Sequence, residues 1–175
     1  MESARLPDPE AAVAGLPLGS AVILRDYDAP DRAARAVSLA RLCRSHGLRL
    51  LVAGDARLAV AVGAHGLHLP EGLVRGSDRR WGLWRKPGWL VTAAAHSPGA
   101  IARARRTGVD AVLLSPVFET ASHPGAPALG SLLFAAWTRK ARIPVYALGG
   151  MTAARTCRLT GSGAAGIAAI GGFAR

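Results

Sequence analysis

The sequence predicts an α/β fold built from parallel strands. Residues 111–114 form the uninterrupted apolar run Ala-Val-Leu-Leu, which is typical of a strand covered by helices on both faces. A loop rich in proline, glycine and hydroxyl residues follows over 115–130, and a helix is expected over 132–141. A glycine that ends a helix and leads into an apolar strand recurs at 63–69, 108–114 and 161–170. This repetition favours a closed barrel or a doubly wound sheet.

Taken in order, the chain contains seven predicted strands, with helices between most of them. The strands cover residues 21–25, 48–53, 66–69, 90–95, 111–114, 143–148 and 167–170. Helices are expected over 8–15, 31–46, 55–63, 97–107, 132–141 and from 152 to the glycines at 161 and 163. Asp55, Ser97 and Thr152 are expected to cap helices with their side chains. The first strand is not followed by G-x-G-x-x-G, which weakens a dinucleotide-binding interpretation.

Two features bound the class of protein. With 175 residues, half of them hydrophobic, the chain predicts a single domain over residues 1–175. No apolar run approaches the length of a membrane span and residues 1–10 lack a signal-peptide pattern, so we expect a cytoplasmic protein without membrane partners.

Residues 70–87 have little periodicity and are expected to form an insertion-like stretch. Cys43 and Cys157 lie in helical patterns and are expected to be packing residues.

The net charge of +11 raises the question of nucleic-acid binding. Twenty of the 22 basic residues are arginine, and they are scattered over the faces and ends of the expected helices without aromatic residues between them. This pattern favours solvated helix faces over a polynucleotide site. Residues 75–86 combine arginine with tryptophan, and either a loop or a partner surface explains them.

Glycine pairs follow the last two predicted strands, at Gly149-Gly150 and Gly171-Gly172. Backbone N–H groups at such positions of a barrel can close on a phosphate, and tight turns are the alternative explanation. His123 lies in the loop over 115–130, where its near-neutral pKa suits proton transfer or phosphate binding. A simple surface role is the alternative explanation. His68 is expected in the core, and His96 is expected to serve local structure beside the Ser97 cap.

Four segments of the chain resemble successive motifs of the thiamine phosphate synthase family, which includes the TenI-like thiazole tautomerases. They are AGDARLAVAVGAHGLHL, TAAAHSP, GVDAVLLSPVFETAS and IPVYALGGMTAAR. The resemblance covers about residues 20–173. It implies a TIM-type (β/α)8 barrel and a transferase that joins an aminopyrimidine diphosphate to a thiazole phosphate with Mg2+, releasing pyrophosphate. In the tautomerase branch it implies isomerisation of the thiazole phosphate.

The resemblance also implies site residues in the second half of the chain. Thr120 and Ser122 match the hydroxyl pair that meets the carboxylate or phosphate region of the thiazole. His123 stands where the synthases have lysine, and we expect it to be catalytic. Pro116 holds the position of the histidine that moves the proton in the tautomerase branch. The matched backbone phosphate contacts are Gly150, Ile170 and Gly171.

Departures from the family pattern gather in the diphosphate and Mg2+ half of the site. Arg25 matches the arginine of the family's Gln-x-Arg-x-Lys strand and is the second expected catalytic residue, but Ile23 and Tyr27 replace the glutamine and the lysine. Asp55 matches the first metal-site aspartate, and Gly54 replaces the asparagine before it. The second metal carboxylate is absent from the segment His68-Leu69-Pro70-Glu71-Gly72-Leu73. We therefore expect Mg2+ to bind weakly.

The leading hypothesis is a thiamine-biosynthesis barrel that binds small phosphates, with the diphosphate half of the site degraded. The alternatives are a thiazole phosphate tautomerase, a different phosphate-handling barrel, and a protein without catalytic activity that binds phosphates or a partner. Self-association is left open. Because the resemblance begins at the family's second strand, we expect seven strands instead of eight, and a natural reading frame that begins upstream of Met1.

Overall fold

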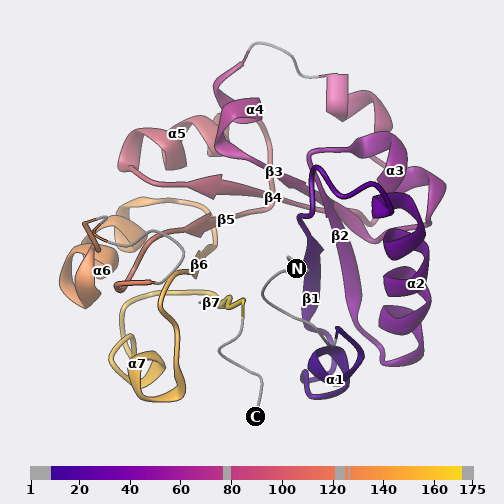
Figure 1. Cartoon of the computed structure of the whole chain (residues 1–175). Coiled ribbons are helices and arrows are strands. Elements are labelled where there is room, and N and C mark those ends of the chain that lie inside the picture. Colours follow the sequence, from indigo (N-terminus) through magenta and orange to yellow (C-terminus); the bar gives the residue numbers. More distant parts are fainter. Residues whose placement is uncertain (1–8, 77–79, 121–124, 126, 171–175) are drawn as a thin grey trace. The chain divides into compact units, whose positions relative to one another are not determined.

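The computed structural model describes residues 9–76, 80–120, 125 and 127–170 (Figure 1). Its strands are β1 Ala21–Leu24, β2 Arg49–Ala53, β3 Gly66–Leu69, β4 Leu90–Ala95, β5 Ala111–Leu114, β6 Val145–Ala147 and β7 Gly166–Ile167. Its α-helices are α1 Pro9–Ala14, α2 Arg32–Ser45, α3 Ala56–Ala61, α4 Glu71–Arg75, α5 Pro98–Arg106, α6 Gly130–Lys140 and α7 Ala153–Cys157, and a 3-10 helix, η2, covers Arg80–Trp84.

The seven strands are hydrogen-bonded in the order of the chain, from β1 to β7. The ladders β1·β2, β2·β3, β4·β5, β5·β6 and β6·β7 are all parallel. A doubly wound sheet reverses its strand order at a switch point, whereas a (β/α) barrel adds each strand beside the one before it. The sequential order therefore confirms the barrel-type α/β fold with seven strands.

The chain divides into two compact units, residues 1–91 and residues 92–172. In the first unit, β2 and β3 are buried along nearly their whole length, and Leu50, Val52 and Leu69 have no exposed surface. Helix α2 contributes the buried side chains of Ala36, Leu39, Ala40 and Cys43. Burial on both faces explains why these strands read as continuous apolar runs.

The second unit is built around β5, whose four residues are all buried. Phe134 of α6 is fully buried, and α5 contributes Ala100, Ile101 and Ala104. The prediction of one domain over residues 1–175 stays a prediction. Among the described residues, no helix is both long enough and apolar enough to cross a membrane.

The three expected helix caps are present. Leu58 N–H donates to Asp55 Oδ1 over 2.9 Å, Ala100 N–H to Ser97 Oγ over 3.1 Å, and Arg155 N–H to Thr152 Oγ1 over 3.2 Å. Each cap satisfies one of the N–H groups that a first helical turn leaves without an intrahelical partner.

Three predictions about elements were wrong. Residues 70–87 contain the helices α4 and η2, which are too short to show a period. The last strand is Gly166–Ile167 instead of residues 167–170. Cys43 is buried as expected, but Cys157 is exposed, because it lies in the short helix α7, which buries none of its residues.

Candidate functional site

In the unit of residues 92–172, polar and glycine residues follow directly after β4, β5 and β6. His96 follows β4, Ser115 follows β5, and Gly149-Gly150 lie beyond β6. Because these strands are parallel neighbours, their carboxyl ends meet at one edge of the sheet. This is the edge at which parallel α/β folds bind their ligands.

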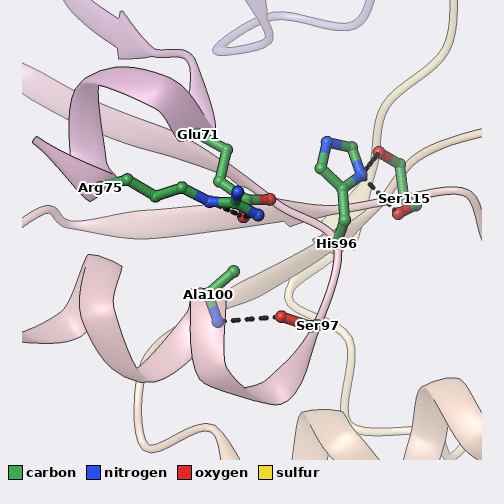
Figure 2. A network of polar contacts seen from close by, with 6 residues as sticks. All are labelled: Glu71, Arg75, His96, Ser97, Ala100 and Ser115. Carbon is green, nitrogen blue, oxygen red and sulfur yellow. Dashed lines mark hydrogen bonds and ion pairs between the residues drawn. The ribbon is translucent and has the colours of Figure 1, made fainter.

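His96 and Ser115 are in contact at this edge, as Figure 2 shows. The Nδ1 atom of His96 lies 2.8 Å from the backbone oxygen of Ser115 and 3.2 Å from its Oγ. A carbonyl oxygen can only accept, so the shorter contact fixes the proton of the neutral imidazole on Nδ1 and leaves the lone pair on Nε2. Sequence reasoning assigned His96 to the Ser97 cap and missed this link, because the register of β4 with β5 decides it.

The loop after β5 runs close against Gly149 and Gly150. Val117 N–H donates to Leu148 O over 2.9 Å, and Phe118 N–H donates to Gly149 O over 3.1 Å. A Cβ atom at Gly150 would lie 2.3 Å from Glu119 O, and Gly150 has a φ of +63°. The packing of the two loops therefore requires glycine at this position whether or not a phosphate binds there.

Arg155 ties the same two loops together. Its Nη1 atom donates to Glu119 O over 3.1 Å and to Gly150 O over 2.8 Å. Its guanidinium lies 5.6 Å from the ring centroid of Phe118, and that of Arg158 lies 5.2 Å from the same ring. Two permanent positive charges are thus held beside the loops that follow β5 and β6. Nothing in the sequence distinguished Arg155 from the other scattered arginines.

The remaining predicted residues of this unit fall into two groups. Thr120 and Ile170 are half-buried, with Thr120 directly after Glu119 in the loop and Ile170 just beyond β7. Ser122, His123 and Gly171 lie outside the described residues.

In the unit of residues 1–91, Arg25 follows β1, and His68 lies on β3, which is one strand removed from β1. His68 is buried, as expected. Burial, and then the positive charge of Arg25, lower the pKa of His68 to about 4. His68 is therefore neutral at neutral pH and lies within electrostatic reach of the expected catalytic arginine.

Asp55 is already engaged by two groups in this unit. Its Oδ1 accepts the capping hydrogen bond from Leu58, and its Oδ2 lies 3.6 Å from Nη1 of Arg32. The Glu71 carboxylate is bound by Arg75, whose Nε donates to Oε1 over 2.8 Å (Figure 2). Within the described ranges, no group of three or more His, Cys, Asp or Glu side chains could hold a metal ion.

Comparison with solved structures bears on the fold. A thiamine phosphate pyrophosphorylase from Pyrococcus furiosus matches with a TM-score of 0.75 and 22% identity, over 95% of this chain and 79% of that chain. At this identity the match shows that the two proteins share a fold.

Sequence comparison bears on the family as well as on the fold. A thiamine-phosphate synthase of Thiobacillus denitrificans is 36% identical over 168 residues, which cover 94% of this chain and 78% of that protein. One of Parasynechococcus marenigrum is 37% identical over 141 residues, 81% of this chain and 40% of that longer protein. The family model described as thiamine monophosphate synthase matches residues 8–173. A match over nearly the whole chain shows that this protein belongs to the thiamine monophosphate synthase family.

Proposed function

We propose that this chain binds thiazole phosphate at the loops after β5 and β6 and joins it to an aminopyrimidine diphosphate, releasing pyrophosphate. Family membership and relatives named thiamine-phosphate synthase support this enzyme function. The observation that carries it is the pair of loops after β5 and β6 that Arg155 ties together, with glycine backbone at the ligand-binding edge.

In this proposal the phosphate of the thiazole meets backbone N–H groups of Gly150, Ile170 and Gly171, and the hydroxyls of Thr120 and Ser122 orient the ring. Arg155 holds the two loops in register, so it is a positioning residue. His123 contacts the bound phosphate or moves a proton. A bond between the thiazole and the pyrimidine group forms as the bond between the pyrimidine group and pyrophosphate breaks. Arg25, in the unit of residues 1–91, stays a predicted catalytic residue, because a guanidinium can stabilise the negative charge that develops on pyrophosphate.

Enzymes of this family are generally Mg2+-dependent, but the described residues do not fit a magnesium site. Magnesium takes near-octahedral oxygen ligands and usually one or two carboxylates. Asp55 has one oxygen in a helix cap and the other beside a guanidinium, and Glu71 is bound by Arg75.

The contact between His96 and Ser115 favours a second candidate, isomerisation of a thiazole phosphate. This reaction needs a group that takes a proton from one atom of the ring system and returns it to another. The imidazole of His96 contacts the residue directly before Pro116, the position at which the tautomerase branch carries its histidine.

Binding is tested first, by thermal unfolding with thiazole phosphate, the pyrimidine diphosphate and thiamine phosphate in turn, because a ligand of the folded state raises the apparent stability. We expect thiazole phosphate to stabilise the protein. Arg155→Gln removes charge-assisted hydrogen bonds and should weaken that binding about tenfold or more. Arg158→Gln is the matched control, because Arg158 also packs against the ring of Phe118 but does not make the hydrogen bonds of Arg155 to Glu119 O and Gly150 O.

Turnover separates the remaining alternatives. Formation of thiamine phosphate and pyrophosphate from the two substrates supports the synthase, whereas isomerisation of thiazole phosphate alone, lost in His96→Ala, supports the tautomerase. Stabilisation without either reaction indicates a phosphate-binding protein. If none of the three phosphates stabilises the chain, the proposed function is wrong. A cytoplasmic location and self-association stay predictions.

A further inference from the structure

Tyr27, Arg32 and the turn Ala53-Gly54-Asp55 form a connected cluster in the unit of residues 1–91. Tyr27 lies shortly after β1, Arg32 is the first residue of α2, and the turn leads from β2 into α3. Two of these positions, Tyr27 and Gly54, are among those at which the chain departs from the family pattern. Their contacts indicate that these two departures form one structural unit.

The ring of Tyr27 lies over Gly54. A Cβ atom at Gly54 would lie 3.3 Å from Cε1 of Tyr27 and 3.8 Å from Cγ of Pro70, and Gly54 has a φ of +71°. A larger side chain at position 54 would therefore meet the ring as well as an unfavourable backbone conformation. The tyrosine fills the space that a polar side chain at position 54 would use.

Arg32 packs against the same ring and faces the carboxylate. Its guanidinium lies 5.7 Å from the ring centroid of Tyr27, and its Nη2 donates to Ala53 O over 2.5 Å. Its Nη1 lies 3.6 Å from Oδ2 of Asp55, and only 14% of its side chain is exposed. A cation at the first position of a helix is opposed by the helix dipole, so these contacts, and not the helix, hold Arg32 in place.

We infer that Arg32 is the built-in cation of this site and that it keeps divalent metal ions away from Asp55. A metal ion at Oδ2 of Asp55 would lie beside a fixed guanidinium charge, and repulsion between like charges opposes its binding. The carbonyl of Ala53, a further oxygen that could serve a metal, already accepts from Arg32. The inference rests on the proposed function and deepens it, since Asp55 matches the position at which the family pattern has its first metal-site aspartate.

The test measures thermal unfolding with millimolar Mg2+ against NaCl of equal ionic strength, with no organic ligand present. We expect no Mg2+-specific shift in the melting temperature of the unmodified chain. Arg32→Ala frees Asp55 Oδ2 and Ala53 O, so we expect this variant to gain a Mg2+-specific upward shift. The shift should disappear in the double variant Arg32→Ala/Asp55→Asn.

Arg35→Ala is the matched control on the same helix, because Arg35 pairs with Asp26 and Asp31 and not with Asp55. We expect it to respond to Mg2+ as the unmodified chain does. Should Arg32→Ala fail to fold, Arg32→Gln removes the charge and keeps a donor for Ala53 O.

Two results would overturn the inference. One is a Mg2+-specific shift in the unmodified chain that Asp55→Asn removes. The other is that Arg32→Ala or Arg32→Gln folds but its melting temperature gains no Mg2+-specific shift. Because Mg2+ is the only ligand added, either outcome is independent of whether thiazole phosphate binds, so it is distinct from a failure of the proposed function.

Discussion

Single residues in this protein take their chemistry from burial and from neighbours that lie far away in the sequence. His68 lies in an apolar strand, and burial together with the positive charge of Arg25 keeps its side chain neutral. His96 is exposed, and a contact with Ser115, 19 residues away, fixes its tautomer. The same residue type is therefore a core residue at one strand and a candidate proton carrier at the end of the next.

The pH dependence of stability tests the burial of His68. Its pKa is about 4 in the folded chain against 6.5 for an ordinary histidine side chain, so between these values the unfolded chain binds more protons. The free energy of unfolding should therefore fall as the pH falls from 6.5 towards 4, by up to about 3 kcal/mol from this residue. Chemical denaturation across this range measures the slope.

His68→Leu is the control for that experiment, because it removes the titrating group and keeps an apolar side chain in β3. The slope between pH 6.5 and 4 should become shallower in this variant. An unchanged slope would show that His68 is not the group responsible.

At the scale of elements, closely paired strands require glycine at positions where the surrounding sequence gives no reason for one. Gly66 begins β3, and a Cβ atom there would lie 1.9 Å from Leu90 O and 2.7 Å from Cδ2 of Leu51. The first of these atoms belongs to the backbone of β4, which cannot rotate away. Gly149 and Gly150 are constrained in the same way by the loop after β5.

Gly66→Ala should lower the free energy of unfolding by about 3 kcal/mol or more, since it forces an atom into a packed backbone. Gly72→Ala is the matched control. Gly72 lies in α4, nothing lies within 4 Å of an added Cβ atom, and its φ is not in the left-handed region. Removing a helical glycine should leave the stability equal or raise it by up to about 1 kcal/mol. Equal effects of the two substitutions would contradict the packing argument.

At the scale of the whole molecule, the net charge of +11 acts against the compact state by self-repulsion. Within the part of the chain that the structure describes, Arg32, Arg35 and Arg75 form ion pairs with carboxylates. We expect the melting temperature to rise as NaCl is added from low ionic strength, because salt screens repulsion between exposed charges. A fall in melting temperature over the same range would show that favourable ion pairs outweigh the repulsion.

The sequence predicted the parallel α/β class, six of the seven strands to within two residues at each end, and the three helix caps. These depend on apolar runs and on local hydrogen bonds, which neighbouring residues determine. It failed for α4 and η2, which are too short to show periodicity, and for the end of the last strand. The site residues Thr120 and Ile170 were named by resemblance, and Gly150 was named both by its place in a glycine pair and by resemblance; their roles stay predictions.

Local pattern thus determined which segments are strands and helices, because a buried strand and a capped helix carry their signal in adjacent residues. Only the tertiary structure decided which side chains meet. The contacts of Arg155 with Glu119 O, of His96 with Ser115 and of Arg32 with Asp55 join segments between 19 and 36 residues apart. Strand register and loop packing set these distances, and neither leaves a pattern in the residues themselves.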